Sequence, residues 1–106
     1  MATLQRIPID ETVLAAFCHT WKIAKLELFG SFLTGDAGQE SDIDLLVTYQ
    51  PGARWSLLDH VHIENALSDL AGRKVDLVSR QAIETGHNAI RRNAILGTAV
   101  PIYVAT

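Results

Sequence analysis

The chain has 106 residues, enough for one compact domain spanning residues 1–106 but too few for a separate substrate-binding domain. With 48% hydrophobic and 20% charged residues and no long apolar run, its composition is typical of a globular protein and excludes a membrane span. The net charge of −3 disfavours direct nucleic-acid binding, which needs a clustered positive surface.

The first 20 residues mix charged and polar side chains with apolar ones, unlike a secretory signal, so we expect a cytoplasmic protein. Cys18 is the only cysteine, which excludes an internal disulfide. Its small and apolar neighbours indicate a core residue rather than a nucleophile. We therefore assign Cys18 no chemical role.

The first half of the chain predicts one helix and two strands. Apolar residues spaced by three and four predict an amphipathic helix over residues 10–21, with Asp10 as its N-cap. Residues 23–29 form the first predicted strand. Three glycines and a polar run at residues 30–41 predict a turn, at most one helical turn, and a loop. Residues 42–48 form the second predicted strand.

The second half predicts two helices and two short strands. Apolar spacing predicts a helix over residues 55–71, ended by Gly72. Residues 75–78 form a third strand, residues 81–96 another helix, and residues 99–104 a closing edge strand, where its proline is tolerated. This order predicts an α+β fold, a two-layer α/β arrangement in which helices pack on a small mixed β-sheet.

A Gly-Ser pair directly follows the first predicted strand. Gly30 lets backbone N–H groups turn toward a ligand without a side chain in the way, and Ser31 adds a hydroxyl. If a helical turn begins here, its free amides also favour an anion such as phosphate. The pair alone is more typical of an ordinary turn, so its meaning depends on other residues.

Two carboxylates begin the second predicted strand, and ten residues separate Ser31 from the first of them. Because side chains alternate along a strand, Asp42 and Asp44 lie on one face, with Cα atoms about 7 Å apart. Carboxylate oxygens suit Mg²⁺, and a pair at this spacing can flank two ions about 4 Å apart. A lone Asp-x-Asp is more commonly a solvated strand start.

A third carboxylate, Asp76, lies within the third predicted strand, which is otherwise apolar. A buried charge there needs a cation, hydrogen bonds or a position at the wet edge of the sheet. A metal ion shared with Asp42 and Asp44 meets this need, and so does a salt bridge from Arg73 or Lys74. The residue alone leaves both alternatives open.

Together these residues resemble the signature of the nucleotidyltransferase superfamily related to DNA polymerase β. That signature joins a Gly-Ser pair, ten residues, an Asp-x-Asp strand and a later strand with a third aspartate. The sequences LFGS at residues 28–31 and SDIDLLV at residues 41–47 are particularly similar to the minimal nucleotidyltransferases, single small domains often encoded beside a HEPN-domain protein. The resemblance covers nearly the whole chain, and it is specific because three separate elements agree.

The resemblance implies a reaction and a set of roles. An acceptor hydroxyl would attack the α-phosphate of ATP in line, with two Mg²⁺ ions stabilising the attacking and leaving oxygens. Asp42 and Asp44 would bridge both ions, and Asp76 would hold the ion nearer the acceptor. Gly30 and Ser31 would bind the β- and γ-phosphates. These five residues are the candidate catalytic, metal-binding and nucleotide-binding residues.

One position departs from the resemblance. Many relatives carry an arginine shortly after the Gly-Ser pair, where this chain has Thr34, so a cation facing the triphosphate is missing. Phosphate binding could be weaker, another basic residue could replace the arginine, or the site could be idle. The candidate replacements are Lys25, Arg73, Lys74, Arg91 and Arg92, each of which would otherwise be a solvated surface charge.

Other residues of the predicted helix over 55–71 carry weaker indications. His60 and His62 are two positions apart and point in different directions, which disfavours a shared metal ion. We expect its apolar start to pack into the core, while any excess apolar surface would form a homodimer or partner interface. The apolar residues concerned are Trp55, Leu57, Leu58 and Val61.

Two classes of function follow. In the first, the chain is a protein adenylyltransferase, similar to antitoxins that place AMP from ATP on a tyrosine of a HEPN ribonuclease toxin. In the second, it is a non-catalytic antitoxin that neutralises such a partner by complex formation. A subunit of a small-molecule nucleotidyltransferase, such as those that modify aminoglycosides, is disfavoured because those enzymes carry an additional helical domain.

Overall fold

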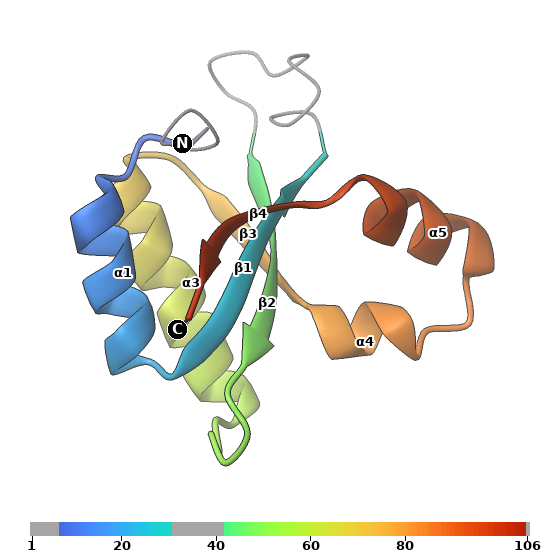
Figure 1. Cartoon of the computed structure of the whole chain (residues 1–106), viewed down its shortest axis with the longest axis horizontal. Coiled ribbons are helices and arrows are strands. Elements are labelled where there is room, and N and C mark those ends of the chain that lie inside the picture. The colour runs from blue at the N-terminus through green and yellow to red at the C-terminus, as the bar shows by residue number, and fades with distance from the viewer. Residues whose placement is uncertain (1–6, 31–41, 106) are drawn as a thin grey trace.

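One four-stranded sheet organises the chain. The computed structural model describes residues 7–30 and 42–105 (Figure 1). Its elements are α1 (Glu11–Thr20), β1 (Ile23–Phe29), β2 (Ile43–Tyr49), α3 (Leu57–Ala71), β3 (Val75–Ser79), α4 (Arg80–Glu84), α5 (Ala89–Thr98) and β4 (Val100–Val104). The strand order is β3-β2-β1-β4; β1 is antiparallel to β2 and β4, and β2 is parallel to β3. The expected α+β fold with a small mixed sheet is therefore confirmed.

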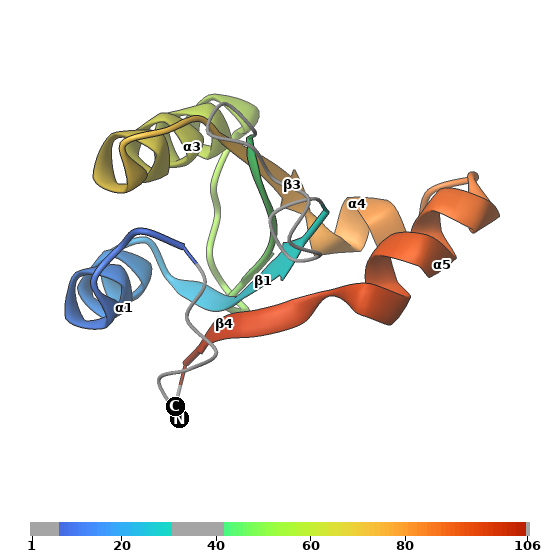
Figure 2. The same cartoon turned by 90° about the horizontal axis from the view of Figure 1, so that it is seen from above.

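Helices cover both faces of the sheet (Figures 1 and 2). The pair α1 and α3 lies on one face, over the main core. The pair α4 and α5 lies on the other face, over a smaller core formed by Phe29, Leu46, Ile83 and Ile95. Because alternate strand residues point to opposite faces, Asp44 shares the α4–α5 face with Leu46. None of the helices in the described part of the chain has the length and apolar character needed to cross a bilayer.

Local sequence explains where the first helices begin and end. The Asp10 carboxylate accepts hydrogen bonds from two backbone N–H groups in the first turn of α1, at 3.0 and 3.2 Å. A capping box between Ser56 and Asp59 begins α3. Gly72, with φ of 72°, ends it in the left-handed conformation that glycine adopts readily. The predicted N-cap of α1 and C-terminus of α3 are confirmed.

The prediction of a single helix over residues 81–96 is wrong. The structure has two helices there, and a turn containing Gly86 separates α4 from α5. Asn88 caps the second helix, because its side chain accepts a hydrogen bond from Arg91 N at 3.0 Å. Gly86 and the N-cap residue Asn88 thus divide the segment into two helices, although its apolar spacing predicted one continuous helix.

The first turn of α3 is more exposed than expected. Leu57 and Leu58 are 80% and 78% exposed and Val61 is 41% exposed, so the expectation that they pack in the core is wrong. The buried side of α3 begins one turn later, with the fully buried Ile63 and Leu67.

Trp55 precedes α3 instead of belonging to it. Its indole N–H donates to the backbone carbonyl of Trp21 at 2.7 Å, and the two rings meet edge to face with centroids 5.3 Å apart. This contact between distant segments removes residue 55 from the helix predicted to begin there, and keeps the ring partly buried.

Candidate active site

Two of the three predicted carboxylates are neighbours across parallel strands. Asp44 of β2 pairs in register with Asp76 of β3, and adjacent strands lie about 4.8 Å apart. Paired residues project from the same face of a sheet. Asp42 immediately precedes β2, and alternation puts it on that face too. The fold thus brings all three aspartates to the end of the sheet where β2 and β3 begin, as the sequence predicted for Asp42 and Asp44.

Gly30 lies beside these carboxylates, at the end of β1. Its neighbour Phe29 is the register partner of Asp44. The φ of Gly30 is 81°, and a Cβ added there would collide with Asp44 Oδ2 and lie 3.2 Å from Asp44 Cγ. The left-handed backbone therefore favours glycine, and a side chain there would have to displace the Asp44 carboxylate. Ser31 and Thr34 lie outside the described residues.

The carboxylates carry negative charge in partial contact with solvent. Asp42 and Asp76 are exposed and Asp44 is half-buried. Burial raises the pKa of Asp44, and the neighbouring charges of Asp76 and Asp42 raise its pKa further. Asp76 satisfies its charge by lying at the exposed edge strand. Lys74 forms a long ion pair with Asp42, with 3.9 Å between its Nζ and Asp42 Oδ2. Three carboxylates gathered at one end of the sheet favour a cation there.

The donor set suits a divalent cation such as Mg²⁺, because carboxylate oxygens are its preferred protein ligands. As the side chains stand, no three His, Cys, Asp or Glu residues in ranges 7–30 and 42–105 are close enough to hold one ion. Asp42, Asp44 and Asp76 would therefore have to rotate toward a common ion. Their exposure leaves room for this rotation.

Side chains of α3 hold the outer edge of β3, on both sides of the third carboxylate. Val75 N donates to Ser68 Oγ at 2.9 Å, and Leu77 N donates to Glu64 Oε2 at 2.7 Å. The Leu77 carbonyl accepts from His60 Nε2 at 2.8 Å, in the tautomer with the proton on that nitrogen. The three α3 residues are one turn apart and so share a face. In the sequence, only the spacing of four residues between His60, Glu64 and Ser68 indicated that they act together on β3.

The two histidines of α3 have different partners. His60 Nδ1 accepts from the Tyr49 hydroxyl at 3.0 Å, and His62 packs on Trp21 with ring centroids 5.7 Å apart. Burial, and secondarily the charge of Asp59, raises the pKa of Tyr49 to about 12, so its hydroxyl stays protonated at neutral pH. His60 thus ties α3 to the sheet, and His62 packs α3 against the turn that follows α1.

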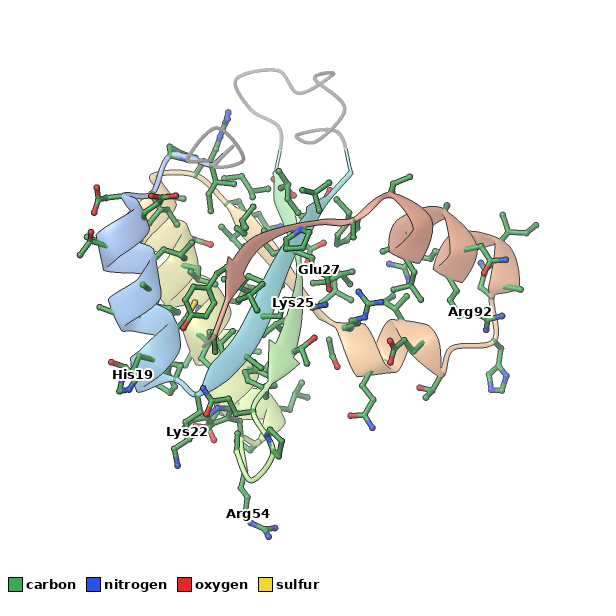
Figure 3. All side chains as sticks on the ribbon, in the orientation of Figure 1. His19, Lys22, Lys25, Glu27, Arg54 and Arg92 are labelled. Carbon is green, nitrogen blue, oxygen red and sulfur yellow. The ribbon has the colours of Figure 1, made fainter. Side chains whose placement is uncertain are left out.

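The proposed replacements for the missing arginine occupy different places. Lys74 Nζ lies 3.9 Å from Asp42 Oδ2, at the carboxylates. Lys25 Nζ lies 3.9 Å from Glu27 Oε1 on the middle of the sheet, and Arg92 donates to a backbone carbonyl of the turn before α5 (Figure 3). Of these three cations, only Lys74 contacts a candidate site residue.

A buried ion pair between Glu27 and Arg80 was not predicted from the sequence. Glu27 is 4% exposed, and its Oε1 accepts from Arg80 Nη1 at 2.6 Å. Arg80 Nε also donates to Glu84 at 2.9 Å, so the arginine joins β1 to α4. Glu27 is the register partner of Leu46, two positions from Asp44. A single acid within an apolar strand was the available signal.

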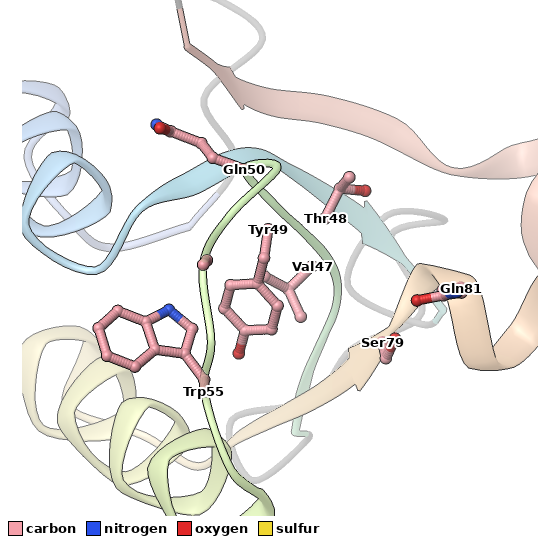
Figure 4. Close-up of a pocket in the computed structure, with 8 residues that line it drawn as sticks. Val47, Thr48, Tyr49, Gln50, Trp55, Ser79 and Gln81 are labelled. Carbon is pink, nitrogen blue, oxygen red and sulfur yellow. The ribbon is translucent and has the colours of Figure 1, made fainter.

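The cavity in Figure 4 lies at the opposite end of β2 from the aspartates. Its volume is about 340 Å³. The hydroxyl of Thr48 is buried and has no hydrogen-bond partner among the described residues. Because the cavity and the aspartates lie at opposite ends of β2, the candidate site is separate from the cavity. The cavity is lined by Val47, Thr48, Tyr49, Gln50, Ala53, Trp55, Ser79 and Gln81.

Comparison with known proteins agrees with this geometry. The nucleotidyltransferase domain family matches residues 10–96. The protein adenylyltransferase MntA of Thermococcus cleftensis is 32% identical over 90 residues, which cover 81% of this chain and 86% of that protein.

Solved structures share the fold. A candidate minimal nucleotidyltransferase superposes with a TM-score of 0.66 at 33% identity, covering 87% of this chain and 88% of that one. A chain from the complex of tri-AMPylated HEPN toxin with MNT antitoxin of Shewanella oneidensis superposes with a TM-score of 0.59 at 15% identity, covering 90% and 70%. The second likeness concerns the fold alone. This chain belongs to the nucleotidyltransferase domain family and has the fold of the minimal nucleotidyltransferases.

Proposed function

We propose that this chain is a protein adenylyltransferase, which transfers AMP from ATP to a hydroxyl group of a partner protein. The observation that carries the proposal is the pairing of Asp44 with Asp76 beside Gly30. The proposed acceptor is a tyrosine of a HEPN-type toxin, which makes the chain an antitoxin. The named activity of the Thermococcus relative and the AMPylated toxin in the complex of similar fold support this choice.

The strand order gives each candidate residue a side of the site. Gly30 ends β1, Asp44 lies on the central β2, and Asp76 lies on the edge strand β3. A triphosphate held at Gly30 and the proposed Ser31 therefore lies on one side of Asp44. An acceptor hydroxyl enters on the other side, where Asp76 is exposed and can orient its proton.

In the proposed reaction the acceptor hydroxyl releases its proton to water or to Asp76 as its oxygen forms a bond to the α-phosphorus. The bond from that phosphorus to the β-phosphate oxygen breaks, and pyrophosphate leaves. Two bound Mg²⁺ ions would stabilise the negative charge on the attacking and leaving oxygens. Asp42 and Asp44 are the proposed ligands of both ions, and Asp76 is the proposed ligand on the acceptor side. Gly30 admits the Asp44 carboxylate against the backbone, so the phosphates and the carboxylate can approach one another.

The test combines the purified chain, Mg²⁺, each labelled nucleoside triphosphate in turn, and the protein encoded next to it in the genome. We expect mass spectrometry to find AMP on a tyrosine of the neighbour protein only when ATP and the chain are both present. The Asp42→Asn/Asp44→Asn double variant should form no adduct.

A neutralisation assay separates catalysis from binding. We expect the double variant to bind the partner but not to neutralise it. Full neutralisation by this variant, with no adduct from the wild-type chain, would instead identify a non-catalytic antitoxin that acts by complex formation.

A further inference from the structure

Lys74 lies opposite Asp42 where β2 and β3 begin. The parallel ladder starts with the pair Ile43 and Val75, so residues 42 and 74 are the next positions outward. Ile43 N donates to the carbonyl of Lys74 at 2.9 Å, which holds the two backbones together. The Lys74 ammonium lies 3.9 Å from Asp42 Oδ2. The cation therefore faces an oxygen that is a proposed metal ligand.

This ion pair is weak and easily opened. Its distance exceeds that of a hydrogen bond, which is about 2.7–3.2 Å. The Lys74 side chain is 74% exposed and that of Asp42 is 46% exposed. Exposed pairs of this kind contribute little to stability. Lys74 therefore adds only a little to the stability of the chain, in contrast to the well-buried Glu27, which has a short contact to Arg80.

The charges at this end of the sheet explain what the pair does. Asp42, Asp44 and Asp76 place three like charges on one face, and repulsion among them opposes the folded arrangement. Lys74 offsets one of these charges. Its position immediately before β3 puts it on the side of Asp76 and away from Gly30, with the strand that carries Asp44 between them.

We propose that Lys74 is a positioning residue that holds Asp42 in the metal-free chain and is displaced from it when divalent cations bind. The inference rests on the proposed function, because it requires Asp42 to be a metal ligand. Ammonium and metal ion compete for the same carboxylate, so Lys74 stabilises the empty site and lowers its metal affinity. Because Lys74 lies on the acceptor side, it does not replace the missing arginine at the triphosphate.

The test uses Lys74→Met, which keeps the aliphatic chain and removes the charge. Arg54→Met is the matched control: it makes the same change of charge at an exposed residue far from the carboxylates (Figure 3). Free Mn²⁺ measured by electron paramagnetic resonance gives the dissociation constant of each variant. We expect Lys74→Met to bind Mn²⁺ about two- to five-fold more tightly than the wild-type chain, and Arg54→Met to bind it equally.

Thermal unfolding supplies a readout that a merely structural role would not reproduce. Without metal, the midpoint of Lys74→Met should lie about 1–4 °C below that of the wild-type chain. With saturating Mn²⁺ the deficit should vanish, because the metal then occupies Asp42 in both proteins. A deficit that persists unchanged in Mn²⁺ would overturn the inference.

A third variant separates failure of this inference from failure of the proposed function. If Mn²⁺ binding is lost in Asp42→Asn/Asp44→Asn but unchanged in Lys74→Met, the metal site stands and the role of Lys74 is refuted. If the double variant binds Mn²⁺ as well as the wild-type chain, the aspartates are not the metal site, and the proposed function is refuted together with the inference.

Discussion

The buried ion pair between Glu27 and Arg80 gives the sharpest test of how the sheet is held to α4. Arg80→Met removes the guanidinium that lies 2.6 Å from a carboxylate with 4% exposure. Breaking a buried pair in this way costs about 3–5 kcal/mol. Lys25 remains 3.9 Å from the carboxylate, so we expect the lower end, about 3 kcal/mol. For a chain of this size that lowers the thermal midpoint by roughly 12 °C.

The double variant Glu27→Met/Arg80→Met shows whether the loss comes from a stranded charge. With both charges replaced by apolar side chains of similar length, the cost should fall to about 1 kcal/mol or less. Urea unfolding followed by the fluorescence of Trp21 and Trp55, which lie on the opposite side of the sheet, measures the stability of all variants. A double variant less stable than Arg80→Met would refute the reasoning, because it would mean that packing rather than charge holds α4.

Substitutions at Gly30, Asp44 and Glu64, with Gly97→Ala and Glu64→Gln as comparisons, test the candidate site and its support. Gly30→Ala should destabilise the chain by about 1–2 kcal/mol or more, the cost of its left-handed backbone. Gly97→Ala, where a Cβ meets nothing within 4 Å, should instead stabilise α5 by about 0.5 kcal/mol, and thermal unfolding measures both. Asp44→Asn should stabilise the metal-free chain at pH 7 but not below about pH 4. The reason is that the raised pKa of Asp44 gives a contribution to stability that is full at low pH and lost as the pH rises through that pKa, which urea unfolding at both pH values measures. Glu64→Ala should cost about 1.5–3 kcal/mol, since Leu77 N loses a charged acceptor; amide hydrogen exchange at Leu77 should speed up, and less so in Glu64→Gln.

Local patterns predicted the parts of the fold that local burial determines. Alternating polar and apolar residues or short apolar runs predicted the strands β1 and β2. Their observed bounds, 23–29 and 43–49, lie within one residue of the predicted ones. The helix over 81–96 failed because Gly86 and Asn88 interrupt it, although the apolar spacing continues. The start of α3 was misplaced because Trp55 packs on a ring 34 positions away, a contact that spacing does not reveal.

The site shows the same division between local and distant information. Alternation alone predicted that Asp42 and Asp44 share a face. The family resemblance implied that Asp76 joins Asp42 and Asp44, but its alignment with Asp44 depends on the parallel pairing of β2 with β3, which the sequence did not predict. The sequence predicted only part of the need for glycine at position 30, because the Asp44 carboxylate that occupies the space of a Cβ there comes from another strand. Contacts between residues 27 and 80, 53 positions apart, lie beyond sequence patterns altogether.

The support of β3 by α3 explains how Asp76 can be both fixed and accessible. An edge strand leaves a row of unpaired backbone groups, which another strand could cover at the risk of burying the carboxylate or of aggregation. Here Glu64, Ser68 and His60 satisfy that edge with side chains from one helix face. The helix α3 packs on the other face of the sheet, and α4 follows the far end of β3, so Asp76 at the start of the strand stays exposed. The proposed protein acceptor would therefore have access over the β3 edge, whereas a fifth strand in that place would close this approach.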